Sequence, residues 1–318
     1  MARFVARRLF TGVVTILLAS MVLFLLVDLL PGDPVRSLFG FGRPDPLLLQ
    51  QMREALNLDK PLIAQWWLFM VDFVTADFGT TRTGVPVDDV IRASLPVSVV
   101  ILAGVLLMQL LVAPVLVWLA GMRQGTRMDH VADTAVIVLV SIPALVAAFV
   151  VQAVFVYWTD LFPSPVWQFS DVPGWQNYTM PILALGLGSA AHLALVGRTE
   201  LLAGMSTPWV RAARALGMPR GHLVRIDALR PASGAMVQLL GANLAVLVTG
   251  LIVVEDVFDA PGIGSALLRA IQDQDRVLML TLIMFVLVFV IAVSTISDLA
   301  HAWLDPRLRD EALHVDGS

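Results

Sequence analysis

Residues 93–122 read ASLPVSVVILAGVLLMQLLVAPVLVWLAGM, which is 30 residues without an aspartate, glutamate, lysine or arginine. An α-helix rises 1.5 Å per residue, so about 20 apolar residues cross the roughly 30 Å hydrocarbon layer of a bilayer. Peptide groups in lipid must form hydrogen bonds within the protein, and a helix pairs them inside one segment. The stretch therefore predicts a transmembrane helix.

Five further stretches lack these four charged residue types. They are 9–27, 134–159, 172–197, 231–254 and 277–297, with lengths of 19, 26, 26, 24 and 21 residues. The sequence thus predicts an all-α integral membrane protein with six transmembrane helices. The fourth stretch opens with Pro173, Gly174 and polar residues, so its helix is expected to begin near Thr179.

Composition excludes several classes of protein. Only 14% of the residues are charged and 58% are hydrophobic, whereas an ordinary soluble domain carries about 25% charged residues. The chain has no cysteine, and its single lysine, Lys60, follows Asp59, so there is no phosphate-binding loop. Its histidines lack the spacing of a zinc hydrolase, and a net charge of −4 gives no reason to expect nucleic acid. A soluble globule is ruled out.

The positive-inside rule gives an orientation. With the N-terminus in the cytoplasm, 13 basic residues lie inside and 8 outside, six of these 8 in one long segment, 28–92. Both termini are then cytoplasmic. An alternative interpretation of the first 27 residues is a cleaved signal peptide, but an apolar run of 19 residues exceeds the usual length and no small-x-small cleavage site precedes Asp28.

The expected organisation has four parts. Residues 1–30 form an N-terminal transmembrane helix, and residues 31–92 form an extracytoplasmic segment with one helix over 46–56. Residues 93–304 form the core with five transmembrane helices, and residues 305–318 form a cytoplasmic tail that is disordered after Arg309.

Polar residues at membrane depth are few, and they are Gln109, Gln152, His192 and Asn243. Each is either an interhelical hydrogen bond or a contact in a translocation path. An ion-coupled carrier needs ionisable groups at this depth, and an intramembrane protease needs a Ser/His or Asp/Asp pair. Neither pattern is present, so both classes are disfavoured.

A loop inside residues 198–231 has a short-helix pattern. Ser206 or Thr207 can cap a helix over 209–216 with Pro208 in its first turn, and Gly217 followed by Pro219 ends it. Ala212, Ala213 and Ala215 let another protein approach closely. The alternative is a solvated loop that owes its six arginines to the positive-inside rule.

This loop resembles that of the membrane permeases of binding-protein-dependent ABC importers, in their dipeptide/oligopeptide/nickel class. The family signature is Glu-Ala-Ala, three residues, Gly, nine residues, Ile-x-Leu-Pro. Arg211-Ala212-Ala213, Gly217 and Leu229 occupy matching positions, whereas Arg211, Asp227 and Arg230 replace Glu, Ile and Pro. The peptide-class version is closer and matches residues 210–217, with Leu216 in place of its Lys.

Further motifs extend the resemblance along the chain. They are Leu30-Pro31-Gly32-Asp33-Pro34, Leu58-Asp59-Lys60-Pro61, Asp77-Phe78-Gly79, Ser141-Ile142-Pro143, Val254-Glu255-Asp256-Val257-Phe258, Pro261-Gly262-Ile263-Gly264 and Leu304-Asp305-Pro306-Arg307-Leu308-Arg309.

The resemblance implies the fold of type I importer permeases, a bacterial inner-membrane location and no catalysis by this chain. It implies a second homologous permease, two ATPase subunits that bind ATP and Mg, and an extracytoplasmic substrate-binding protein; this chain binds no cofactor or metal. The residues implied to couple to the ATPase are Arg211, Ala212, Ala213, Arg214, Gly217, Met218 and Leu229. Peptides are the expected solute; the alternatives are nickel or another small solute, or, from another class, an ion-coupled carrier.

The segment 255–276 is the expected outer gate. Pro261-Gly262-Ile263-Gly264 lets it turn back sharply, and residues 266–271 can form a short helix. The apolar residues Ile263, Leu267, Leu268 and Ile271 favour a re-entrant segment that seals the path. The alternative is a solvated loop between two spans.

Overall fold

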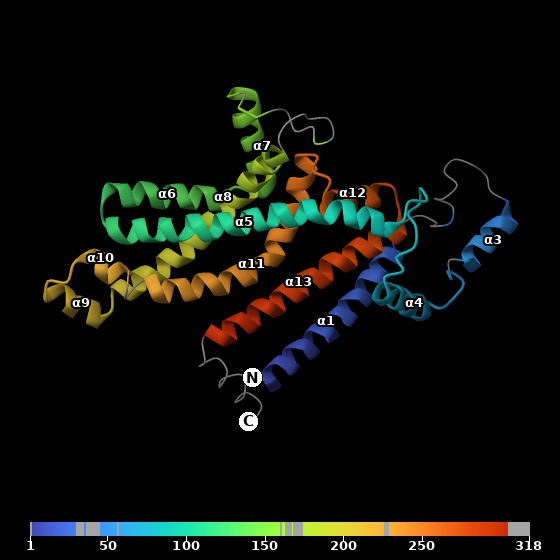
Figure 1. The fold of residues 1–318 in the computed structure, drawn as a ribbon, viewed down its shortest axis with the longest axis horizontal. Helices are drawn as coiled ribbons and strands as arrows, with labels where there is room; N and C mark the ends of the chain where they lie inside the picture. Colours follow the sequence, from blue (N-terminus) through green and yellow to red (C-terminus); the bar gives the residue numbers. More distant parts are fainter. Residues whose placement is uncertain are drawn as a thin grey trace. The chain divides into compact units, whose positions relative to one another are not determined.

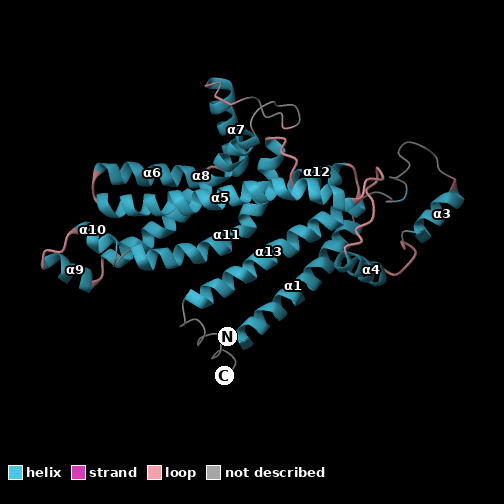
Figure 2. Ribbon diagram, viewed as in Figure 1, coloured by secondary structure: helices cyan, strands magenta, loops and turns pink. Residues whose placement is uncertain are grey.

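The described residues of the computed structural model are mostly helical, as Figures 1 and 2 show. It describes residues 2–29, 35, 45–55, 57–159, 161–162, 167, 174–225 and 229–304. Its helices are α1 (Ala2–Asp28), α3 (Pro46–Ala55), α4 (Leu62–Thr75), α5 (Val87–Arg123), α6 (Arg127–Ser141), α7 (Ala144–Gln152), the π-helix η1 (Ala153–Trp158), α8 (Gly174–Met205), α9 (Pro208–Ala215), α10 (Arg220–Leu223), α11 (Leu229–Val257), α12 (Ile263–Gln272) and α13 (Arg276–Leu304). Over these residues the expected all-α class is confirmed, and β pairing is limited to an isolated bridge between Thr80 and Pro86.

Four helices are long and apolar enough to cross a membrane. They are Val5–Asp28, Val87–Arg123, Gly174–Met205 and Arg276–Ile296. Two bent pairs, Arg127–Ser141 with Ala144–Trp158 and Ala232–Gly241 with Asn243–Val257, raise the number to six if each pair is one span. The described part of the chain thus offers four to six spans by length and composition.

The stretch 134–159 is not one straight helix, contrary to the sequence prediction. Its two halves meet at an angle of 106°. Ile142 is extended (φ −80°, ψ 119°), because the ring of Pro143 disfavours the helical conformation of the residue before it. Pro143 also lacks the N–H that would continue the helix, so α6 ends and α7 starts in a new direction.

Two other helices differ from expectation. α8 begins at Gly174, five residues before the predicted Thr179, and the Thr179 hydroxyl donates to the Trp175 carbonyl (2.9 Å) inside the helix. The polar residues that open this stretch are thus helical. The sequence also missed α4, a 14-residue apolar helix within the predicted extracytoplasmic segment, whereas α3 matches the helix expected over 46–56 to within a residue.

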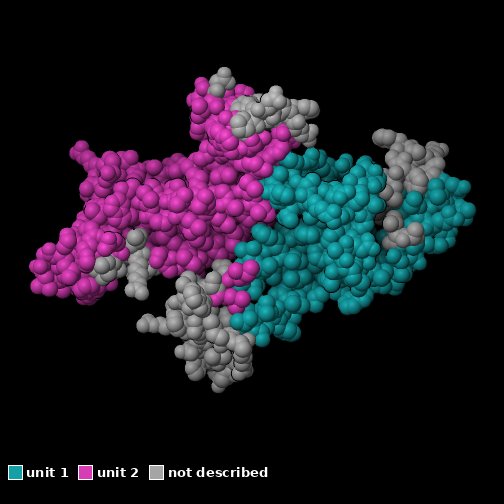
Figure 3. All heavy atoms as spheres, in the orientation of Figure 1, with its two compact units in different colours: residues 1–97, 261–295 teal, residues 98–260, 296–318 magenta. Residues whose placement is uncertain are grey.

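The chain forms two compact units, coloured separately in Figure 3. Unit 1 comprises residues 1–97 and 261–295. In it α1 contacts α4, and the Trp66 indole N–H donates to the Ser20 hydroxyl (3.2 Å). Five phenylalanines form a connected aromatic cluster with ring centroids 5.4–6.2 Å apart, namely Phe24, Phe69, Phe73, Phe78 and Phe285. The ion pair between Arg276 and Asp28 (2.8 Å) adds a link between α13 and α1.

Unit 2 comprises residues 98–260 and 296–318, with α8 packed against α6, α7 and α11. Small residues permit this close packing. A Cβ on Gly197 would lie 2.8 Å from a Val117 methyl carbon and 2.7 Å from the Met236 sulfur, so α5 and α11 both approach the backbone of α8 there. The predicted tail 305–318 and the motifs at residues 30–34 and 305–309 lie outside the described residues.

Candidate functional site in the loop between α8 and α11

The loop after α8 folds into the short helix that the sequence predicted. α9 runs over Pro208–Ala215, with Pro208 in its first turn, where a missing N–H costs nothing. The predicted side-chain cap does not form. Thr207 occupies the N-cap position, but its hydroxyl donates to the Gly204 carbonyl (2.9 Å) and makes no cap hydrogen bond.

The end of α9 is a Schellman motif. The Met218 N–H donates to the Ala213 carbonyl (3.1 Å), and the Gly217 N–H donates to the Arg214 carbonyl (3.0 Å). Gly217 has φ +85°, a left-handed conformation that glycine adopts without steric cost. Pro219 then precedes α10, so the chain turns sharply at a fixed point.

The inner face of the loop belongs to the core of unit 2. Val210 and Ala213 are 1% and 2% exposed and join a buried cluster with residues of α5, α8, α10 and α11. Ala213 therefore packs against its own chain and is closed to a partner, whereas Ala212 and Ala215 are exposed. The three alanines therefore do not form one exposed face of small residues: one is buried in the core of unit 2 and two are exposed.

The outer face of α9 combines apolar and basic side chains. Leu216 is 85% exposed and Trp209 is 54% exposed. This surface, hereafter the α9 surface, comprises Trp209, Arg211, Ala212, Arg214, Leu216 and Met218. Leu229 is the first residue of α11, and its side chain lies outside the described part. A rigid helix with an exposed tryptophan and arginines has the composition of an interface centre.

The four deep polar residues have different surroundings. His192 on α8 and Asn243 on α11 are 3.5 Å apart through Nδ1 and Nδ2, so they form an interhelical contact. Gln109 on α5 is 1% exposed, and neither atom of its amide has a hydrogen-bond partner among the described residues. Gln152, the last residue of α7, is half-buried.

The expected gate segment contains α12, which starts at Ile263, three residues before the predicted helix. Ile263 and Leu267 are buried, Leu268 is half-buried and Ile271 is exposed.

The sequence did not anticipate the burial of Glu255. This carboxylate is 0% exposed and accepts a hydrogen bond from the Ser98 hydroxyl (2.6 Å). Its position near the end of an apolar stretch gave no sign of a buried partner.

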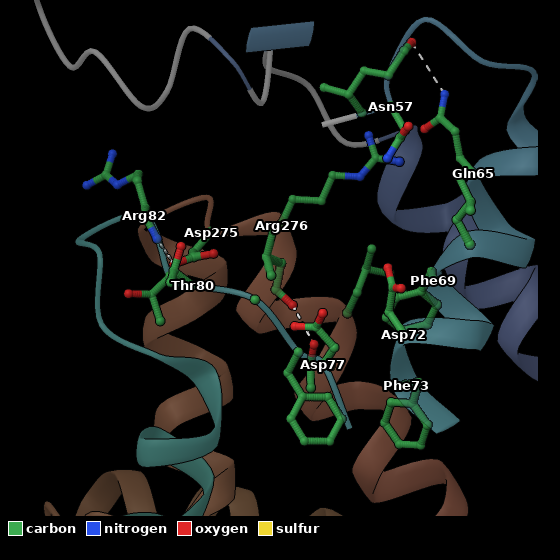
Figure 4. Close-up of a pocket in the computed structure, with 18 of the residues that line it drawn as sticks. Asn57, Gln65, Phe69, Asp72, Phe73, Asp77, Thr80, Arg82, Asp275 and Arg276 are labelled. Carbon is green, nitrogen blue, oxygen red and sulfur yellow. Dashed lines mark hydrogen bonds between the residues drawn. The ribbon is translucent and has the colours of Figure 1, made fainter. Parts of the chain in front are cut away.

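Unit 1 holds a hollow of about 750 Å³ (Figure 4). Its apolar lining includes Phe24, Phe69, Phe73 and Phe78, and its polar lining includes Asp72, Asp77, Arg82, Asp275 and Arg276. The Arg276 side chain extends toward Asn57, while Asp72 and Arg82 lie on opposite sides. Such a lining can contact a solute that has both charged and apolar groups. No cluster of three potential metal ligands occurs among the described residues.

Comparison with known proteins identifies the family. Residues 113–310 match the family described as binding-protein-dependent transport system inner membrane component. The chain belongs to this family. Residues 1–88 match the N-terminal part of membrane components of the same kind of transport system.

Relatives match over almost the full length. The dipeptide transport system permease protein DppB of Bacillus subtilis (strain 168) is 28% identical over 320 residues, covering 100% of both chains. The glutathione transport system permease protein GsiC of Salmonella choleraesuis (strain SC-B67) is 29% identical, covering 97% of this chain and 99% of the relative. GsiC of Escherichia coli (strain K12) is 28% identical with the same coverage.

Membership assigns the chain's general role. Inner membrane components of this family are permease subunits of ABC importers and lack an ATPase site of their own. Such systems include ATPase and substrate-binding partners. The resemblance drawn from the motifs is therefore confirmed at the level of the family and of an inner-membrane importer.

Proposed function

We propose that this chain is one of two homologous permeases that together form the path of a peptide importer, with six spans and both termini in the cytoplasm. Its partners are a second permease, two ATPase subunits that bind ATP and Mg, and an extracytoplasmic binding protein. The relatives' names support the solute class, since one denotes dipeptides and the other glutathione, itself a short peptide. The hollow in unit 1, with aromatic and charged lining, supports it further. Nickel or another small solute is the alternative.

The α9 surface carries the proposal. α9 is anchored on one side by Val210 and Ala213, and its opposite side exposes Leu216, Trp209 and two arginines. An exposed apolar patch of this kind, rimmed by charge, is typical of a protein contact. We propose that this surface docks on an ATPase subunit and transmits its movement to the permease.

Cysteine protection tests the docking, because the native chain has no cysteine. A Leu216→Cys variant of the assembled transporter should react slowly with a maleimide, and rapidly after the ATPase subunits are stripped away. Glu200→Cys, an exposed position on α8 outside the α9 surface, is the matched control and should change little. Equal rapid labelling of position 216 in both preparations would refute docking at α9.

The pathway proposal concerns the four deep polar residues. Gln109, Gln152, His192 and Asn243 supply amide and imidazole groups to a path otherwise lined by apolar and small side chains. Such groups suit the peptide backbone, which offers N–H donors and C=O acceptors whatever its side chains. The 3.5 Å contact of His192 with Asn243 gives each of these two side chains a polar partner.

The gate proposal concerns α12, which we place at the outer mouth of the path, below the binding protein. Its buried positions Ile263 and Leu267 support a sealing role, and Ile271, near the C-terminal end of the helix, is exposed. Cysteines at 263 and 267 should label poorly from outside in the resting state and well when ATP binding traps the outward-open state. Equal rapid labelling in both states would leave the solvated-loop interpretation.

A further inference from the structure

The turn between α5 and α6 is held by polar contacts from two directions, all within unit 2. α5 ends at Arg123, Gly125 has φ +80°, and Thr126 caps α6 by accepting from the Asp129 N–H (3.2 Å). The Asp129 carboxylate in turn accepts from the Gly125 N–H (2.9 Å). Two hydrogen bonds within the turn therefore stabilise its conformation.

Arg220 provides the first contact. It begins α10, three residues after the Schellman glycine that ends α9. Its Nε donates to the Gly121 carbonyl (2.9 Å), and a terminal nitrogen donates to the Gln124 side-chain oxygen (3.0 Å). Because a guanidinium group is planar, two bonds from its one plane fix orientation as well as distance.

Arg198 provides the second contact, from the helix that leads into α9. A terminal nitrogen donates to the Asp129 carboxylate (2.9 Å), and the other forms an ion pair with Asp133, one turn further along α6. Asp129 is 6% exposed and the Arg198 side chain is 18% exposed. Water screens such a pair little, so removing one partner leaves a poorly solvated charge.

We infer that Arg220 and Arg198 clamp the α5–α6 turn to the α8–α10 segment, so that the turn moves with α9 as one body. The inference rests on the proposed docking of α9. Without the clamp, movement of α9 would reach the spans through its covalent link to α8 and the apolar core. With it, the same movement is delivered directly to α5 and α6. The two arginines are positioning residues, since they act through the turn.

Distances between spin labels test the clamp in the assembled transporter. Labels at Arg127→Cys and Leu216→Cys, both exposed, should report the same distance in the ATP-free and ATP-trapped states. In an Arg220→Met background the distance should change between states, and peptide import per ATP hydrolysed should fall several-fold while ATPase assembly persists. Arg225→Met, an exposed arginine nearby, is the matched control and should alter neither readout.

Each outcome has one meaning. A distance that changes between states in the unaltered background refutes the clamp, as does Arg220→Met with unchanged distances and import ratio. If Arg220→Met does not assemble, Gln124→Ala, which removes one of the two Arg220 bonds, should give an intermediate import ratio. A label at 216 that stays equally accessible to water with and without ATPase subunits refutes the docking of α9 instead.

Discussion

At the scale of single residues, the backbone conformation of Gly217 fixes where α9 ends. A Cβ there would meet no atom within 4 Å, so the constraint is φ +85° and not space. Gly217→Val should cost about 1–2 kcal/mol locally and lower substrate-stimulated ATP turnover of the reconstituted transporter. Gly217→Asn, which tolerates the left-handed region, should recover most of the turnover. Equal turnover for valine and glycine would mean that the Schellman end has no role in coupling.

Gln109 allows a second prediction at the scale of single residues, on the effect of replacing its buried amide. Both atoms of its amide are buried without a partner among the described residues, and each such group costs about 1–3 kcal/mol. Gln109→Leu, of similar volume, should raise the thermal unfolding midpoint of the purified permease and reduce peptide import if the amide serves the path. A lower midpoint would contradict this account, because it would reveal a hydrogen bond that the substitution removed.

At the scale of elements, the Asp28–Arg276 pair links α1 to α13 within unit 1. Arg276 also lies with its Cζ 5.3 Å from the centroid of the Phe24 ring, a cation–π distance. Arg276→Met should destabilise the chain in detergent by about 1–3 kcal/mol, since it leaves the partly buried Asp28 carboxylate without its ion-pair partner. Arg92→Met is the matched control, because the 76% exposed Arg92 side chain pairs with Asp88 at the surface and should contribute under about 1 kcal/mol. Similar shifts for both variants would contradict a special role for the partly buried Asp28–Arg276 pair.

The sequence predicts elements that depend on neighbouring residues, and it does not predict contacts between residues far apart in the chain. Absence of charge located the long helices, and Pro208, Gly217 and Pro219 located α9, because those signals act within a few residues. The bend at Pro143 has a local cause, but the absence of charge that locates the stretch 134–159 does not reveal it. The site was harder to predict. Arg220 forms hydrogen bonds with residues 99 and 96 positions away in the sequence, and Arg198 forms one with Asp129, 69 positions away. No local sequence pattern encodes these hydrogen bonds.

At the scale of the whole molecule, family membership assigns the general role of the chain, and local structure shows how the loop between α8 and α11 is built. Membership assigns an importer permease over residues 113–310, and relatives match end to end, so the chain's general role does not depend on any one loop. The structure adds how the loop is built: an inner face of α9 in the core of unit 2, an outer face left exposed, and arginine bonds to a second turn. An element that transmits movement needs both an anchored face and an exposed face, since an unanchored helix would absorb the movement it receives.

The final prediction distinguishes four spans from six. Single cysteines at Thr83, Arg127, Thr159, Leu216 and Asp259 are all at exposed positions of a chain without native cysteine. With six spans, an impermeant maleimide added to intact spheroplasts should label 83, 159 and 259. Position 127 should react only after permeabilisation, and position 216 only after permeabilisation and removal of the ATPase subunits. Positions 127 and 159 flank the bent pair α6 and α7–η1, whose halves meet at 106°. If that pair re-enters instead of crossing, 127 and 159 will label from the same side. Positions 216 and 259 test α11 in the same way, and labelling of 216 from outside would reverse the orientation drawn from the arginines.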